Sequence, residues 1–165
     1  MGTEIERKFL VRGDGWRALA DGTRRLRQGY LSRDPAREVR VRIVDDAEAW
    51  LTVKAKRPGP ARAEFEYPVP VADARELLAL CTGRLIEKDR HHLRVAAPGE
   101  WVVDVYTHGQ EGLTVLEVEW DGWAEPGATP FTLPDWAGED VTGDRRYSNA
   151  SLAAPEVTPA RRPAR

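Results

Sequence analysis

Like-charged residues recur at every second position along much of this chain, and this spacing constrains the fold more than any other feature. In a β-strand, residues two positions apart share one face, so each pair predicts a strand with a charged side. Apolar residues such as Val39, Val41 and Ile43 fill the alternate positions. The sequence therefore predicts a mostly antiparallel β-protein. The pairs are Glu4 and Glu6, Arg40 and Arg42, Lys54 and Lys56, Glu64 and Glu66, Lys88 and Arg90, and Glu117 and Glu119.

The signs of these pairs are sorted by segment. The chain has 25 Lys and Arg and 27 Asp and Glu in 165 residues. About eight like-charged pairs at this spacing would then occur by chance, so for any single pair the solvated face of a sheet is the favoured explanation. Here, however, three of these rows are purely acidic and three purely basic, whereas a surface selected for solubility mixes both signs within a strand. Acidic rows favour a divalent cation and basic rows a polyanion, which predicts a site for a polyphosphate chelated by Mg²⁺ or Mn²⁺.

Size and overall charge exclude several classes of protein. The chain is long enough for one domain with a core. Its net charge of -2 gives no electrostatic reason to bind nucleic acid or a membrane surface. The single cysteine, Cys81, excludes a disulfide framework within the chain. No segment has the length of a membrane-spanning helix and the N-terminus lacks a signal peptide's apolar stretch, so we expect a cytoplasmic protein. We expect this protein to be a monomer or a homodimer.

Helical patterns occur in two places. Asp73 and Glu76 form a potential capping box before the leucine-rich residues 77–80, and Gly83 is a suitable C-terminal stop.

The second helix is expected from about Thr142 to Leu152. Residues 153–165 have no periodicity and consist largely of Ala, Pro and Arg. This composition predicts a disordered tail after a folded domain of residues 1–152.

A series of longer motifs resembles the CYTH superfamily of triphosphate tunnel metalloenzymes. The segment Glu4-Ile5-Glu6-Arg7-Lys8-Phe9-Leu10 matches the Glu-x-Glu-x-Lys signature that opens this superfamily. Further matches follow in the family's order and extend to about residue 152. They are Arg27-Gln28-Gly29-Tyr30-Leu31, Glu38-Val39-Arg40-Val41-Arg42, Leu51-Thr52-Val53-Lys54-Ala55-Lys56, Glu64-Phe65-Glu66-Tyr67, Glu87-Lys88-Asp89-Arg90, Asp104, Leu116-Glu117-Val118-Glu119 and Asp144-Arg145-Arg146-Tyr147-Ser148-Asn149.

For the fold, the resemblance implies an α+β protein whose antiparallel strands, about eight in number, close into a β-barrel. The charged rows would face an internal tunnel. The apolar rows would then face outward, with helices packed outside the barrel, which inverts the usual arrangement of a small barrel. The tryptophans are expected in this outer packing, away from the substrate.

The resemblance also implies roles for the charged residues. In some family members the positions of Lys8 and Tyr30 form a pair proposed to assist proton transfer, and in others a metal-bound water does this work. A basic residue from the terminal helix matches Arg145 or its neighbour Arg146, with Arg145 favoured. Metal-ligand positions match Glu4, Glu6, Glu117 and Glu119, with Asp104, Glu64 and Glu66 lining the same tunnel as further candidates. Phosphate-binding positions match Lys8, Arg40, Arg42, Lys54, Lys56, Lys88 and Arg90.

The implied activity is the metal-dependent hydrolysis of inorganic tripolyphosphate to pyrophosphate and phosphate. A short single domain has no additional module for an organic group, which favours the inorganic substrate. A thiamine or nucleoside triphosphatase, a class IV adenylyl cyclase and a non-catalytic polyphosphate-binding module are the alternatives. The complete acidic rows argue against the last of these, because binding a polyanion alone requires no metal site.

Overall fold

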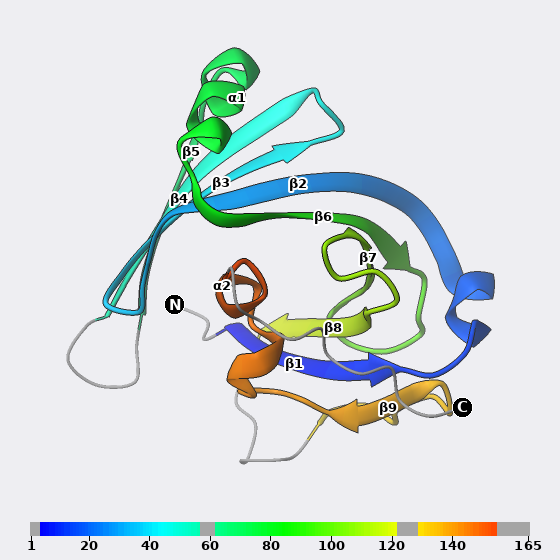
Figure 1. The fold of residues 1–165 in the computed structure, drawn as a ribbon. Coiled ribbons are helices and arrows are strands. Elements are labelled where there is room, and N and C mark those ends of the chain that lie inside the picture. The colour runs from blue at the N-terminus through cyan, green and yellow to red at the C-terminus, as the bar shows by residue number, and fades with distance from the viewer. Residues whose placement is uncertain (1–3, 57–61, 122–128, 155–165) are drawn as a thin grey trace.

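In the computed structural model, nine antiparallel strands of the described residues form one strongly curved sheet (Figure 1). The structure describes residues 4–56, 62–121 and 129–154, with the backbone only at residues 4, 56, 62 and 121. The strands are β1 (Glu4–Val11), β2 (Ala20–Asp34), β3 (Arg37–Val44), β4 (Glu48–Lys56), β5 (Arg62–Pro68), β6 (Thr82–Leu93), β7 (Glu100–His108), β8 (Thr114–Asp121) and β9 (Ala137–Asp140). The helices are α1 (Val71–Ala79) and α2 (Asn149–Leu152), and the 3₁₀ helices are η1 (Gly15–Leu19) and η2 (Arg145–Tyr147).

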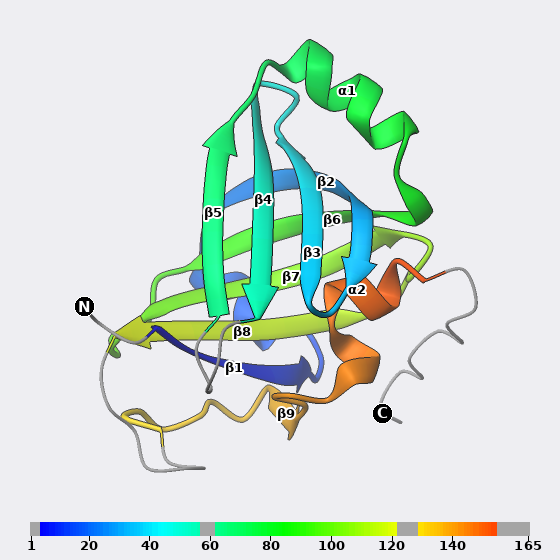
Figure 2. The ribbon, with the colours of Figure 1, turned by 90° about the vertical axis from the view of Figure 1, so that its left-hand side faces the viewer.

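The order of the strands across the sheet is β5-β4-β3-β2-β6-β7-β8-β1-β9. Successive strands wrap around a concave inner face, as the two perpendicular views show (Figures 1 and 2). The mostly antiparallel α+β architecture is therefore confirmed. Closure into a barrel is not: no pairing joins β5 to β9 or β1 within the described ranges. One reason is that β9 occupies the outer edge of β1, opposite Phe9 and Val11.

The outer face of the sheet carries the largest apolar cluster of the described residues. Trp101 and Trp120 lie on this face, and the ring of Phe131 packs edge-on against both, with centroids 4.7 and 5.3 Å apart. Trp16 from η1 and Trp136 join the same cluster. These positions confirm outer packing roles for four tryptophans. Trp50 instead lies opposite Arg42, on the inner face, and Trp123 lies outside the described residues.

The helix α1 covers the outer face of β3 and β4, where its Ala74 and Leu78 are buried. It begins at Val71, before the predicted capping box, and no side chain caps it. That prediction was wrong because Pro70 precedes the helix with a φ of -56° and starts it without a polar cap. Asp73 instead lies in the first turn, where its charge suits the helix dipole. No helix in the described part of the chain is long and apolar enough to span a membrane.

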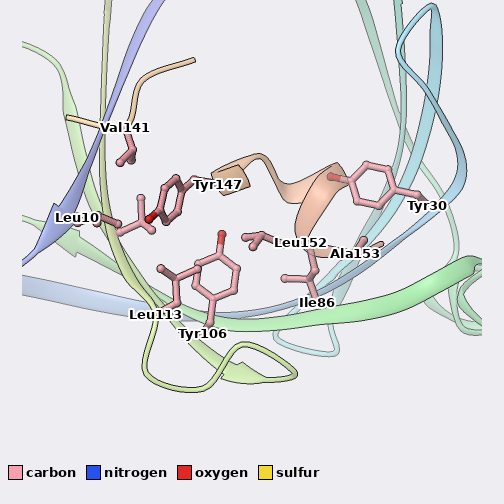
Figure 3. Close-up of a cluster of buried hydrophobic side chains, with 10 residues drawn as sticks. Leu10, Tyr30, Ile86, Tyr106, Leu113, Val141, Tyr147, Leu152 and Ala153 are labelled. Carbon is pink, nitrogen blue, oxygen red and sulfur yellow. The ribbon is translucent and has the colours of Figure 1, made fainter. Parts of the chain in front are cut away.

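The second predicted helix is divided into η2 and α2. Ser148 separates them with an extended backbone, and its side chain accepts a hydrogen bond from the backbone N–H of Ser151. The predicted position outside the sheet is wrong for this segment, because α2 lies within the curve of the sheet (Figure 1). Tyr147 and Leu152 pack there against apolar residues of the inner face, including Leu10 and Tyr106 (Figure 3).

Packing against the sheet continues one residue past Leu152. Ala153 is fully buried, and its carbonyl oxygen accepts a hydrogen bond from the backbone N–H of Arg84 at 2.7 Å. The remainder of the predicted tail, residues 155–165, lies outside the described residues. Gly83, the predicted helix stop, lies in β6 with a φ of +82° and faces Ala153. A Cβ atom at position 83 would overlap the carbonyl oxygen of Ala153.

We therefore expect Gly83→Ala to lower the free energy of unfolding by about 2–4 kcal/mol, combining left-handed backbone strain with displacement of Ala153. Gly109→Ala is the matched control, because Gly109 has a φ of +75° and open space around its Cβ position. The control should cost only about 1–2 kcal/mol, since backbone strain alone remains. Urea denaturation of both variants measures the difference, and equal losses would contradict the tight contact.

Candidate active site

A polar cavity of about 1170 Å³ lies along the concave face of the sheet. Most of the site residues predicted from the sequence line it, and they come from both halves of the sheet. The predicted residues at its wall are Glu6, Lys8, Tyr30, Arg40, Arg42, Lys54, Glu64, Glu66, Arg90, Glu117, Glu119 and Arg145. The structure thus brings these residues together on one surface. The side chains of Glu4 and Lys56 are outside what it describes.

One wall of the cavity is acidic because β1 and β8 pair in a fixed register. Glu6 lies directly opposite Glu119, and Lys8 lies opposite Glu117. Directly opposed side chains of antiparallel strands are close neighbours on one face, and opposed like charges destabilise the pair unless a cation lies near them. Lys8 provides one such cation, since its Nζ atom is 2.9 Å from Glu6 and 3.1 Å from Glu117.

Arg90 of β6 links Glu117 of the acidic wall to the buried Asp104 of β7. Its guanidinium is 2.6 Å from a carboxylate oxygen of Glu117 and forms two hydrogen bonds of 2.8 Å to Asp104 of β7. Asp104 in turn binds the ammonium group of Lys88 at 2.5 Å. Alternating charges therefore follow one another without a break from Lys88 to Glu6.

Among the predicted site residues whose side chains are described, Lys88 and Asp104 do not line the cavity. Both side chains are fully buried, whereas that of Arg90 is 20% exposed. Burial, followed by the nearby cations of Arg90 and Arg42, lowers the pKa of Lys88 to about 8 despite the opposing effect of Asp104. In this arrangement Lys88 and Asp104 hold Arg90 in place, and Arg90 presents its charge to the cavity.

Nearby cations favour the charged form of Glu117 on the acidic wall. Burial would raise the pKa of Glu117, but the charges of Lys88, Lys8 and Arg90 lower it well below its usual range. A carboxyl group with a lower pKa in the folded than in the unfolded chain stabilises the fold above its unfolded pKa of about 4. That contribution is lost as the pH falls through the folded value. Burial likewise disfavours the charge of Lys8, yet Glu117 and Glu6 raise its pKa above the usual value.

The opposite wall is basic and has fewer counter-charges. Arg42 donates from Nε to the Oε1 atom of Gln28 at 3.0 Å and forms no ion pair in the described ranges. Burial and the charges of Arg40 and Arg90 lower the pKa of Arg42 to about 10, so the guanidinium stays charged and is repelled by its neighbours. The positive charge of Lys54 is better compensated, because its Nζ atom lies 3.1 Å from the carboxylate of Glu64.

Glu66 provides partial compensation for Arg40, with an N–O distance of 3.4 Å. Thr52 lies between them and bonds to both, at 3.1 Å to Arg40 and 2.9 Å to Glu66. Glu64 and Glu66 therefore act as counter-ions of the basic wall in this structure.

Tyr30 is 1% exposed and lies on the inner face of the sheet (Figure 3). Its partner across the β2–β3 ladder is Arg40. Burial raises its pKa to about 12, so the phenol keeps its proton at neutral pH. No hydrogen bond joins its hydroxyl to Lys8 in the part of the chain that the structure describes. The two residues therefore offer protonated groups in this arrangement, a phenol and an ammonium.

The terminal segment contributes polar groups that the sequence did not identify. Arg145 lines the cavity, whereas Arg146 bonds to Asp144 and is not among its lining residues. Other lining residues that the prediction missed are Arg33, Pro35, Glu38, Ser148, Asn149, Ala150, Ser151 and Ala154. Most of these lie on or beside α2, and only the tertiary position of that helix could reveal them.

The donor atoms of the acidic wall fit a divalent cation of the magnesium type. Glu6, Glu117 and Glu119 offer carboxylate oxygens from two neighbouring strands, and hard cations prefer oxygen ligands. Within residues 4–56, 62–121 and 129–154, no three His, Cys, Asp or Glu side chains already converge as a metal site. Glu6 and Glu117 are instead bound to Lys8, so a cation would compete with that ammonium group for them.

Known proteins resemble this chain along nearly its whole length. Residues 2–140 match the family model of the CYTH domain. An inorganic triphosphatase of Acetivibrio thermocellus is 42% identical over 153 residues, which cover 92% of this chain and 94% of that protein. One of Nitrosomonas europaea is 35% identical over 155 residues, with 92% and 97% coverage. The crystal structure of an inorganic triphosphatase matches with a TM-score of 0.69 and 33% identity, covering 97% of this chain and 99% of that one.

We expect Asp104→Asn to lower the free energy of unfolding by about 3–5 kcal/mol, because it leaves the buried Lys88 without its counter-charge. Asp21→Asn is the control: it removes the same charge from an exposed pair with Arg94 and should change stability by less than about 1 kcal/mol. Chemical denaturation at pH 7 compares the two. An effect of Asp104→Asn as small as that of the control would contradict the proposed support of Arg90.

Proposed function

The chain belongs to the CYTH domain family, and from this membership we propose that it hydrolyses inorganic tripolyphosphate to pyrophosphate and phosphate with the help of a divalent metal ion. Two curated relatives that match over 92% of the chain are inorganic triphosphatases. Agreement at 42% and 35% identity supports the same activity here.

The observation that carries the proposal is the meeting of two oppositely charged walls in one cavity. Arg42 on the basic wall is charged, largely buried and without a carboxylate partner among the described residues, so an anion would relieve its repulsion from Arg40 and Arg90. Glu6 and Glu119 on the other wall lie opposite each other, so a divalent cation would stabilise these carboxylates beyond the single charge that Lys8 supplies to Glu6. A triphosphate that chelates a metal ion supplies both charges at once.

The basic wall would bind the phosphate groups. Arg40 and Arg42 provide forked donors suited to phosphate oxygens, and Lys54 and Arg90 provide further positive charge. Because strands hold these side chains, the charges are in place before the substrate arrives. Such preorganised charge stabilises the negative charge that develops as a phosphoanhydride bond breaks.

Lys8 and Tyr30 would act as protonated groups. The pKa of Lys8 is raised by Glu117 and Glu6, and that of Tyr30 is raised by burial to about 12, so both keep their protons at neutral pH. Neither is therefore ready to accept a proton in this arrangement. We assign to Lys8 the neutralisation of negative charge on the phosphate oxygens near the bond that breaks. We assign to Tyr30 the donation of a hydrogen bond from its hydroxyl group to a phosphate oxygen.

The carboxylates of Glu6, Glu117 and Glu119, together with Glu4, would hold Mg²⁺ or Mn²⁺. A bound divalent ion would supply Lewis-acid stabilisation of the phosphate charge and lower the pKa of water. We do not assign this role to Asp104, which is fully buried and bonded to Lys88 and Arg90.

The lining of the cavity supports an inorganic substrate over a nucleotide or a thiamine compound. Among its described lining residues, the aromatic one is Tyr30, whose side chain is almost completely covered. An organic ring usually binds between apolar and aromatic surfaces. The lining consists mainly of charged groups, which suit a phosphate chain.

Phosphate release from tripolyphosphate, ATP and thiamine triphosphate, measured in parallel with Mg²⁺ or Mn²⁺, tests the proposal. We expect fastest release from tripolyphosphate, with pyrophosphate as the second product, and none after chelation of the metal. Faster release from either organic triphosphate would contradict the assigned substrate.

Glu6→Gln should lower turnover of tripolyphosphate about 100-fold, because it removes a candidate metal ligand. Glu48→Gln is the matched control, since Glu48 is an exposed strand residue paired with Arg24 and lies outside the cavity lining. The control should keep its turnover within twofold of the wild type. Full activity of Glu6→Gln at limiting Mg²⁺ would contradict the metal assignment.

A further inference from the structure

A β-bulge in β2 changes which residues of this strand face the cavity. Tyr30 lies opposite Arg40 of β3, but the next pair is Ser32 with Val39, so the register shifts by one residue. Simple alternation from Tyr30 would turn Ser32 inward and Arg33 outward. After the bulge the order is reversed. A bulge re-aims the side chains that follow it and is common beside active sites.

Arg33 consequently points to the inner face. It lies opposite Glu38, which is on the same face as Arg40, and both Arg33 and Glu38 line the cavity. Ser32 is turned away, and its hydroxyl donates to the carbonyl oxygen of Arg37 at 2.7 Å. The bulge thus adds a guanidinium to the wall of the site.

The guanidinium of Arg33 is incompletely satisfied. Its Nε atom is buried without a hydrogen-bond partner, and the described residues provide no ion pair for this side chain. Arg37, from the same hairpin, is 81% exposed and paired with Asp34 at 3.4 Å. A buried donor without an acceptor costs free energy, and Arg40 on the same cavity wall has its Nε atom in the same state.

The position of Arg33 extends the basic wall along the strands. The register places Arg33, Glu38 and Lys54 in one row across β2, β3 and β4. The row of Tyr30 and Arg40 lies next to it. Two residues along a strand correspond to about 7 Å. Arg33 therefore adds positive charge to the row of Lys54, at the end of the cavity near Pro35 in the β2–β3 turn, with its Cζ atom 3.6 Å from the Cβ position of Gly83 in β6.

We infer that Arg33 is a further substrate-binding residue, which contacts a phosphate group at this end of the cavity. The inference rests on the proposed function and extends it to a residue that regular strand alternation would place outside. A phosphate oxygen in the cavity would accept a hydrogen bond from the Nη groups of Arg33, which have no partner among the described residues, whereas the Nε atom is buried. The competing explanation is that Arg33 only offsets the charge of Glu38.

Steady-state kinetics with tripolyphosphate and Mg²⁺ separate these explanations. For Arg33→Gln we expect KM to rise about tenfold with kcat within twofold of wild type, because the lost contact is present in the ground state as well as the transition state. Arg33→Lys should recover part of the affinity. Arg37→Gln, the matched control, should leave both constants unchanged. An unchanged KM in Arg33→Gln would overturn the inference in favour of simple charge compensation.

The double variant Ser32→Arg/Arg33→Ser tests the bulge with composition and net charge preserved. Its arginine would face outward, so KM should rise as in Arg33→Gln, and a wild-type KM would contradict the assigned direction. Calorimetric titration with tripolyphosphate and Ca²⁺ measures binding without turnover. A wild type that binds but releases no phosphate would refute the proposed function alone. A wild-type Kd in Arg33→Gln would refute the inference alone.

Discussion

A continuous chain of alternating charges across β6, β7, β8 and β1 is the interaction on which the rest of this site depends. Buried charges are tolerated only when each has a partner, and removing one member leaves another uncompensated. Asp104 is central because it binds two cations while fully buried itself. This series of ion pairs holds the carboxylates of the acidic wall and the guanidinium of Arg90 in one network. Its members, in order, are Lys88, Asp104, Arg90, Glu117, Lys8 and Glu6.

Charge on the inner face requires the apolar core to lie elsewhere. Much of it is found on the outer face, where η1, α1 and the residues around Phe131 cover the sheet. A second apolar cluster shares the inner face with the cavity, where Tyr147 and Leu152 pack against the strands (Figure 3). The side chains of the site are consequently carried by rigid strands, and α2 borders the cavity on the side that faces away from the sheet. This arrangement lets strand register, rather than loops, determine where each charge lies.

Strand alternation predicted much of this arrangement, because the period of two is a local property. It correctly assigned Arg40, Arg42, Glu117 and Glu119 to one surface. It could not reveal Arg33, since a bulge is decided by the pairing of β2 with β3.

Other features also depended on tertiary contacts. Lys88 and Asp104 were expected at the cavity but lie behind Arg90, because depth within a sheet has no local signal. The position of α2 inside the curve of the sheet follows from apolar partners that are distant in sequence, such as Leu10 and Tyr106. The resemblance to known triphosphatases supplied the substrate, which charge patterns alone leave open.

The central claim is that repulsion among the cations of the basic wall destabilises the protein without ligand, and that a bound polyanion relieves this repulsion. Arg42→Gln in melting experiments tests it most directly, with and without tripolyphosphate and Ca²⁺. In wild type, ligand at 100 times its Kd should add about 2.7 kcal/mol of stability. The account predicts that Arg42→Gln melts at the same or a higher temperature than wild type without ligand, and shows a much smaller ligand-induced rise. A variant that melts lower without ligand and keeps the full rise would contradict it.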